Sequence, residues 1–128
     1  MWTMVTVRVL SLLCLAIAFF TPSPGGASAA PSDPWAVAGQ QGLVRIVIVP
    51  MEHASDRSAY ERQIQSLCDP ERTCFLNFYT NSTGATPAVP IPDAIATEAT
   101  ATYRRSMKNG VQVFQWSCRM KVSTQACF

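Results

Sequence analysis

The chain has 128 residues, enough for one domain, and contains ten Lys and Arg residues against eight Asp and Glu residues. Arg8 lies in a predicted signal peptide, and its removal leaves nine basic and eight acidic residues, a net charge of +1. A surplus this small argues against binding to nucleic acid or to an anionic membrane by electrostatics alone.

Residues 1–29 have the pattern of a secretory signal peptide. Arg8 precedes an apolar stretch at 9–20, which is followed by a Pro- and Gly-rich break and by an A-x-A sequence that ends at Ala29. A membrane anchor is the alternative, but about 12 apolar residues fall short of the roughly 20 that cross a bilayer. We therefore expect an exported protein, periplasmic or secreted, without a stable membrane anchor after cleavage.

The next segment, 30–42, is rich in Pro, Gly and small residues and is expected to form a flexible leader. A single domain is expected at 43–128. It begins with residues 43–49, a nearly continuous run of Val and Ile that predicts a central strand covered on both faces. Gly42 and Pro50 bound this run, as residues unsuited to a strand interior do.

The remaining elements are predicted to alternate between helix and strand. They are a helix that Ser55 or Asp56 caps and Asp69-Pro70 stops, a strand at 75–80, a proline-rich loop at 81–92, a helix at 93–108 and a strand at 114–120. Apolar residues four apart predict the helices, and strict alternation predicts a half-exposed last strand at or near an edge of the sheet.

This β-α-β-α-β order predicts an α/β domain with a three-stranded parallel sheet of order 2-1-3 and one helix on each face. The rival arrangement has two layers, with both helices on one face and one strand antiparallel.

Four cysteines remain after signal cleavage, an even number that predicts two disulfides in an exported chain. Their spacings, C-x5-C and C-x8-C, do not match zinc knuckles, and no C-x-x-C redox motif occurs, so neither a metal nor a cofactor is expected. Cys68 ends the first helix and Cys74 opens the next strand, so we expect these two to form a disulfide. Cys118 lies near the end of the third strand, where Cys127 of the tail can reach it, so we expect these two to form the second. The competing pair Cys74–Cys118 would need antiparallel strands.

Ligands of open α/β sheets gather beyond the carboxyl ends of the strands. That rim is predicted to carry the candidate binding residues Glu52, His53, Asn81, Ser82 and Arg119, with Thr83 and Ser117 beside them. A His near an acid and hydroxyls can support acid–base or acyl-transfer chemistry. However, no G-x-S-x-G, P-loop, dinucleotide or metal motif occurs, so no catalytic residue is assigned.

Three functions are considered on these grounds. The absence of catalytic motifs favours a non-catalytic accessory or binding protein with a protein or cell-envelope partner. The second is an inhibitor or immunity-type protein that inserts the loop 81–92 into an envelope enzyme. The third is a small hydrolase that uses His53 and Glu52.

Two clusters have a structural and a functional interpretation. Seven aromatic residues are predicted to be core rather than a stacking platform: Tyr60, Phe75, Phe78, Tyr79, Tyr103, Phe114 and Trp116. Arg104, Arg105 and Lys108 are interpreted as the positive end of the second helix, with an anion-docking patch as the alternative.

The segments Cys74-Phe-Leu-Asn-Phe-Tyr-Thr and Phe114-Gln-Trp-Ser-Cys118 resemble those of a group of short exported proteins from Gram-negative bacteria. These share a C-F-x-x-F-[WY] run, a second helix and a W-x-C near the end. The likeness covers about residues 43–120 and implies export and disulfides. No activity is assigned to the group, so the resemblance transfers no functional residue.

Overall fold

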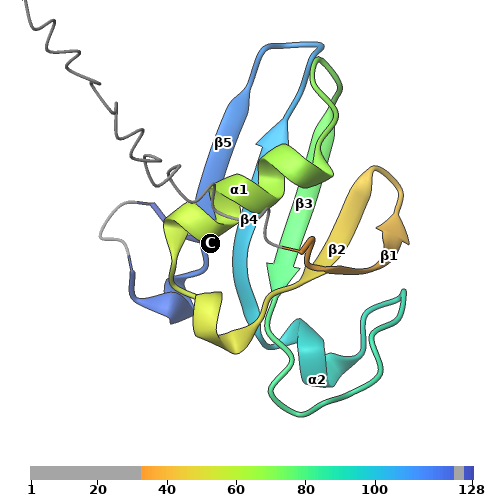
Figure 1. The fold of residues 1–128 in the computed structure, drawn as a ribbon, viewed down its shortest axis with the longest axis vertical. Coiled ribbons are helices and arrows are strands. Elements are labelled where there is room, and N and C mark those ends of the chain that lie inside the picture. The colour runs from red at the N-terminus through yellow and green to blue at the C-terminus, as the bar shows by residue number, and fades with distance from the viewer. Residues whose placement is uncertain (1–32, 123–125) are drawn as a thin grey trace, which may run out of the picture. The chain divides into compact units, whose positions relative to one another are not determined.

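The computed structural model describes residues 33–122 and 126–128, so the predicted signal peptide at 1–29 lies outside the described residues. The strands are β1 (Ala36–Gln41), β2 (Val44–Ile48), β3 (Cys74–Tyr79), β4 (Ala99–Arg105) and β5 (Gln112–Trp116). The helices are α1 (Arg57–Leu67) and α2 (Asp93–Ala96), with short 3₁₀ helices η1 (Met51–His53) and η2 (Cys118–Met120). Figure 1 shows α1 crossing one face of the sheet.

The predicted three-stranded parallel sheet is wrong. The five strands lie in the order β1-β2-β3-β4-β5, and only β2 and β3 pair in parallel, through the connection that contains α1. Every other neighbouring pair is antiparallel. One βαβ unit therefore exists as expected, but hairpins and a longer loop add the other strands to it.

The predicted helix at 93–108 is also wrong. Only the four residues of α2 are helical there, and the chain then forms β4 between β3 and β5. In β4 the side chains of Ala101 and Tyr103 are buried, whereas those of Thr102 and Arg104 are half-buried. Threonine is β-branched and packs well on a pleated surface, so pairing with a strand on each side decides the conformation.

The segment expected to be a flexible leader, 30–42, contains β1. A two-residue turn at Gly42 and Leu43 joins β1 to β2, and Gly42 has φ +62°. Glycine at the first turn position with a positive φ fits a type II′ hairpin, whose twist matches that of the strands. Trp35, just before β1, is buried and meets the ring of Tyr60 edge-on at 5.1 Å between centroids.

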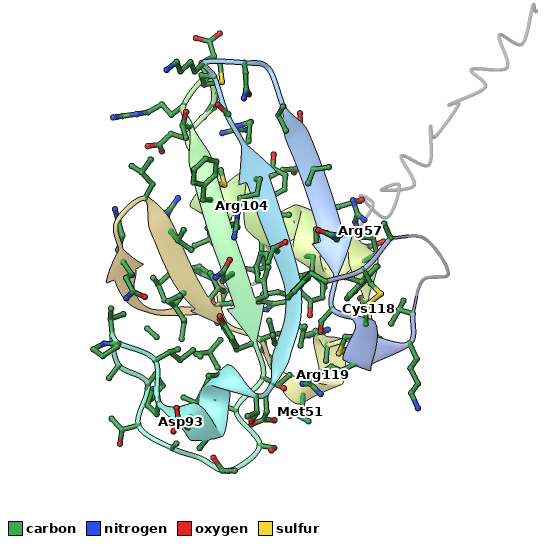
Figure 2. All side chains as sticks on the ribbon, turned by 180° about the vertical axis from the view of Figure 1, so that it is seen from behind. Met51, Arg57, Asp93, Arg104, Cys118 and Arg119 are labelled. Carbon is green, nitrogen blue, oxygen red and sulfur yellow. A yellow bond between two sulfur atoms is a disulfide. The ribbon has the colours of Figure 1, made fainter. Side chains whose placement is uncertain are left out.

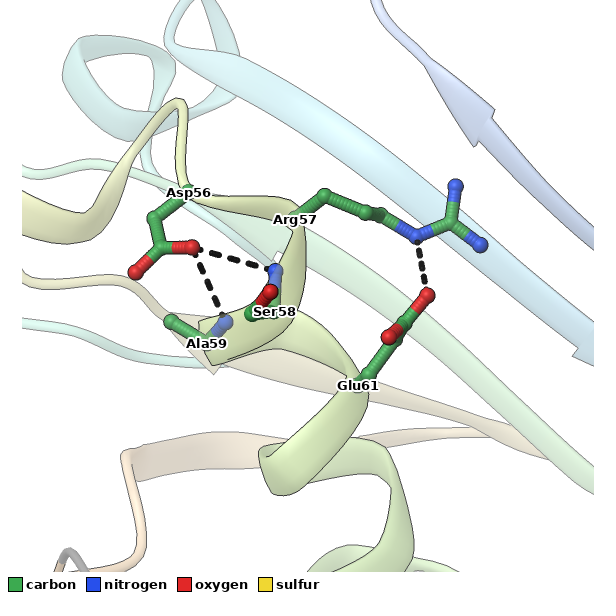
Figure 3. A network of polar contacts seen from close by, with 5 residues as sticks. All are labelled: Asp56, Arg57, Ser58, Ala59 and Glu61. Carbon is green, nitrogen blue, oxygen red and sulfur yellow. Dashed lines mark hydrogen bonds and ion pairs between the residues drawn. The ribbon is translucent and has the colours of Figure 1, made fainter.

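The helix α1 begins where the sequence predicts. The side chain of Asp56 accepts hydrogen bonds from the backbone N–H groups of Ser58, at 3.1 Å, and Ala59, at 3.3 Å (Figure 3). These bonds satisfy donors that the first turn of a helix leaves without partners. In the same turn Arg57 forms an ion pair with Glu61 at 3.1 Å.

One face of the sheet packs against α1 and forms the main core. Ala59, Tyr60 and Ile64 of α1 belong to one buried cluster with Val47, Leu76, Phe78, Ala101, Tyr103 and Trp116 of the sheet. Tyr60 is at its centre, with the rings of Phe78, Phe114 and Trp116 edge-on at 5.0 to 5.5 Å. Most of the predicted aromatic core is confirmed here.

The opposite face is covered only in part. Ile46 and Ile95 are buried there, outside the α1 cluster, and Val89 of the loop 81–92 lies against Gly39 of β1. In Figure 2, which views this face, no helix lies over the middle of β3, β4 and β5, and the C-terminal tail reaches this face at the end of β5, where Gln115 donates to the Ala126 carbonyl at 3.4 Å.

Both predicted disulfides are confirmed. Cys68 is bonded to Cys74 across 5.7 Å between Cα atoms, and Cys118 to Cys127 across 5.0 Å. Structural disulfides form and persist in oxidising compartments, which indicates an extracytoplasmic location for this chain. Within the described ranges, no helix is long and apolar enough to cross a membrane.

Candidate functional site

The carboxyl ends of three strands meet at one edge of the sheet. β4 runs antiparallel to both β3 and β5, so β5 points the same way as β2 and β3. The rim predicted for a parallel sheet therefore exists in this mixed sheet, and η1, the loop after β3 and η2 all begin there.

Part of this rim is a closed polar network. Arg119 of η2 donates to the Thr80 hydroxyl at 3.1 Å and to the Ala99 carbonyl at 2.7 Å. Thr80 donates to the Glu98 carboxylate at 3.1 Å, and the Ser82 N–H donates to the same carboxylate at 3.0 Å. The network thus brings together two predicted site residues, Ser82 and Arg119, through Thr80 and Glu98, which the sequence analysis missed.

Glu98 was missed because it was placed inside a helix. Burial alone would raise the pKa of Glu98, but hydrogen bonds from Ser82 and Thr80 and the charge of Arg119 outweigh burial and lower it. The carboxylate of Glu98 is thus held in its ionised form. Through Thr80 and Arg119 it connects the loop after β3 to η2, which is a structural role.

The other predicted rim residues lie apart from this network. The ring of His53 stacks on that of Trp35 at 6.3 Å with an interplanar angle of 22°. Glu52 is exposed, and no hydrogen bond within the described chain joins it to His53. Asn81 donates to the Ala85 carbonyl at 2.7 Å. The geometry therefore does not assemble the dyad that a hydrolase would need.

A recess of about 490 Å³ opens beside Trp35 at the end of β2. Its lining is mostly apolar and comes from Asp33, Pro34, Trp35, Ala36, Ile48, Val49, Pro50, Met51 and Asn81. Asn81 is thus the one predicted binding residue that lines it. Asp33 is the one ionisable group that the described residues contribute to this wall.

The uncovered part of the sheet carries a second polar centre, at Arg104. Its Nη1 donates to the carbonyls of Leu76 and Tyr103, each at 2.9 Å, and its Nη2 donates to Asn77 Oδ1 at 2.6 Å. Its Cζ lies 5.6 Å from the centre of the Phe75 ring. The predicted role of Arg104 in a helix end is wrong, since the guanidinium is fixed on the face of a strand.

We name the surroundings of Arg104 the open sheet face. It consists of Phe75, Asn77 and Tyr79 of β3, Thr102 and Arg104 of β4, and Val113 and Gln115 of β5. Two of the seven aromatic residues assigned to the core, Phe75 and Tyr79, therefore lie on this face and are half-buried. The strict alternation of buried and half-buried residues along β3 is the signal that separates them from Leu76 and Phe78.

The open sheet face has an uncompensated positive charge. Arg104 is the one charged residue among the seven that form this face, and none of the five described strands contains Asp or Glu. The ion pairs of the described chain join Arg57 to Glu61 and Arg62 to Asp56, away from this face. Burial lowers the pKa of Arg104, which reflects the cost of holding a cation there without a carboxylate.

Among the described residues, no group of three or more His, Cys, Asp and Glu side chains is placed to hold a metal ion. No family model, no curated protein and no solved structure matches the chain.

Proposed function

We propose that this protein is a non-catalytic binding protein of the periplasm that docks a partner protein on its open sheet face. The observation that carries the proposal is Arg104, a cation without a carboxylate at the centre of an uncovered, partly aromatic surface. The predicted signal peptide, the two disulfides and the resemblance to short exported proteins support the compartment.

The composition of this face matches that of protein interfaces. Interface cores are enriched in aromatic residues and arginine and depleted in Lys, Asp and Glu, and binding hot spots favour Tyr and Arg. The open sheet face offers Phe75, Tyr79 and Arg104 and no residue of the depleted types. A recess of about 290 Å³ between α1 and the sheet and the recess of about 490 Å³ beside Trp35 both lie elsewhere, so this face suits a broad partner rather than a small ligand.

The hydrogen bonds of Arg104 specify what the partner presents. A guanidinium has five N–H donors, and three contacts engage two on Nη1 and one on Nη2. One N–H on Nε and one on Nη2 remain, the pair that binds a carboxylate in a bidentate manner. The partner is therefore expected to place an Asp or Glu side chain over Arg104, with apolar contacts on Phe75 and Tyr79.

Site-specific photocrosslinking tests the proposal. The full chain, with a photoreactive amino acid at Thr102, is produced in Gram-negative cells, and a matched control carries it at Ser66, an exposed position on α1. We expect one defined crosslinked partner from position 102 only. Arg104→Gln should reduce the yield by at least about tenfold, and Arg104→Lys, which keeps the charge, by less.

The crosslinked protein is then purified and its affinity measured with both variants, after circular dichroism and mass under non-reducing conditions show that they are folded and oxidised. Equal crosslinking from both positions, or an affinity that Arg104→Gln does not change, would refute the proposal.

A further inference from the structure

The outer edge of β5 already accepts an extended segment of this chain. The N–H of Phe128 donates to the Trp116 carbonyl at 3.3 Å, and the N–H of Cys118 donates to the Phe128 carbonyl at 3.0 Å. The disulfide between Cys118 and Cys127 holds this tail in place. The pairing reaches Trp116 and goes no further up the strand within the described chain, so the first half of β5 is a sheet edge.

The register shows which main-chain groups face outward on that half. Ser106 donates to the Val111 carbonyl and Ser117 donates to the Thr100 carbonyl, each toward β4. Hydrogen-bonded positions alternate along an antiparallel strand, so Val113 bonds to β4 as well. The N–H and C=O groups of Gln112 and Phe114 therefore point away from the sheet, where the described chain gives them no partner.

A recess lies beside this edge, on the face that α1 covers. Its volume is about 290 Å³, and its lining consists of Arg57, Glu61, Ile64 and Gln65 of α1 with Tyr103, Arg105 and Gln112 of the sheet. Ile64 and Tyr103 are buried and form its apolar base. Side chains of a strand added to β5 would alternate between this recess and the open sheet face.

The charges of the recess favour an acidic side chain. Arg57 is paired with Glu61 at 3.1 Å and lies 3.8 Å above the Phe114 ring. Within the described chain Arg105 donates only to carbonyls, those of Asp69 at 2.6 Å and Arg72 at 3.0 Å. One positive charge is thus left over at the mouth of the recess, where a carboxylate would form a charge-assisted bond.

We propose that the free edge of β5 binds an extended peptide segment of another protein by strand addition, with a Glu side chain of that peptide seated in the recess beside Arg105. Main-chain bonds to Gln112 and Phe114 give affinity in this mode of recognition, and the recess gives specificity. The edge of β5 and its recess adjoin the open sheet face without including Arg104, and the proposal does not depend on the function proposed above.

The test uses the oxidised full chain and two synthetic peptides, acetyl-Thr-Val-Glu-Val-Thr-amide and the same peptide with Gln in place of Glu. Backbone amide NMR of the wild type is recorded during titration with each peptide. We expect the largest shifts at Gln112 and Phe114 and an affinity at least about tenfold higher for the Glu peptide. Equal affinities, or shifts confined to other parts of the molecule, would overturn the proposal.

Two variants sharpen this test. Gln112→Pro removes an outward N–H but no bond to β4, so it should abolish binding in a protein that still folds. Arg105→Gln should reduce the preference for the Glu peptide, whereas Arg104→Gln, on the opposite face, should leave it intact. Sedimentation of the protein alone completes the test, because a dimer that Gln112→Pro dissociates would assign this edge to a second copy of the chain and overturn the peptide proposal.

Discussion

The two faces of β3 use the same kind of residue for different purposes. Phe78 points toward α1 and is fully buried between Trp35 and Tyr60, whereas Phe75, three residues earlier, points to the open sheet face beside Arg104. Alternation along the strand places one ring in the core and the other in a surface. The comparison shows that an aromatic residue in a strand acquires its role from what covers that face of the sheet.

The largest expected difference between the faces is in stability. Phe78→Ala leaves a cavity in the packed cluster and should lower the free energy of unfolding by about 3–5 kcal/mol. Phe75→Ala removes a half-buried ring from an uncovered face and should cost about 1 kcal/mol. Urea unfolding with the disulfides intact measures both values, and similar losses would mean that the second face is covered after all.

A smaller effect concerns Tyr60, whose hydroxyl lies 2.8 Å from both the Ala54 carbonyl and the Thr100 hydroxyl. Burial raises the pKa of Tyr60 from 10.0 to about 12, against the opposing influence of the Thr100 bond and of Arg119. Because the pKa is raised in the folded state, the neutral hydroxyl of Tyr60 makes its full contribution to the free energy of unfolding below pH 10. This contribution is lost as the pH rises to 12.

The loss over that interval is on the order of 2–3 kcal/mol. Tyr60→Phe should cost about 1–2 kcal/mol at neutral pH and show none of this loss. Urea unfolding at pH 8 and pH 11, where about half of this loss has developed, compares the two proteins, in which the other titrating groups are the same. A variant that loses as much stability as the wild type would contradict the role given to Tyr60.

The contact between the loop 81–92 and β1 can be tested by substitutions on both sides of it. Gly39 has φ +157°, and a Cβ atom there would collide with a methyl group of Val89. Gly39→Ala should therefore cost about 1–3 kcal/mol through overpacking. Val89→Ala, at a partly exposed position, should cost less, and the double variant should regain the part of the loss that the collision causes, whereas the strain of a side chain at φ +157° remains. Additive losses in this cycle would show that the two residues do not meet.

The smallest effect is expected at the rim, where Glu98 accepts hydrogen bonds from Thr80 and Ser82 of the loop after β3. Because its pKa is lowered in the folded state, its contribution is present above the ordinary value of 4.5 and is lost as the pH falls. Glu98→Gln should therefore be less stable than the wild type at pH 7, with a difference that shrinks in acid. A difference that is constant with pH would show that the charge of Glu98 contributes nothing.

Elements with a local cause were predictable from sequence. The Val and Ile run gave β2, the Asp56 cap gave the start of α1, and both disulfides join cysteines near each other along the chain. The segment of β4, Ala-Thr-Ala-Thr-Tyr-Arg-Arg, fits a spacing of four through Ala99 and Tyr103 as well as it fits alternation. Pairing with β3 and β5 decides between the two, and such contacts are distant in sequence.

The same error concealed the open sheet face. A helix at 93–108 would have covered the second face of the sheet and explained Arg104 as a charged helix end. The rim was predicted correctly because the direction of each strand follows from the order of the elements. Glu98, which lies at the centre of the rim's hydrogen-bond network, was missed because the sequence did not show that α2 ends before it. β1 has no apolar pattern, and the glycine turn before β2 was its only signal.

The two disulfides each span a short stretch of chain, with a sequence separation of 6 from Cys68 to Cys74 and of 9 from Cys118 to Cys127. When such a chain is delivered N-terminus first, the earlier pair meets an oxidant before the later pair has emerged. Nearest-neighbour oxidation then produces the native bridges directly, so this protein should mature without a disulfide isomerase.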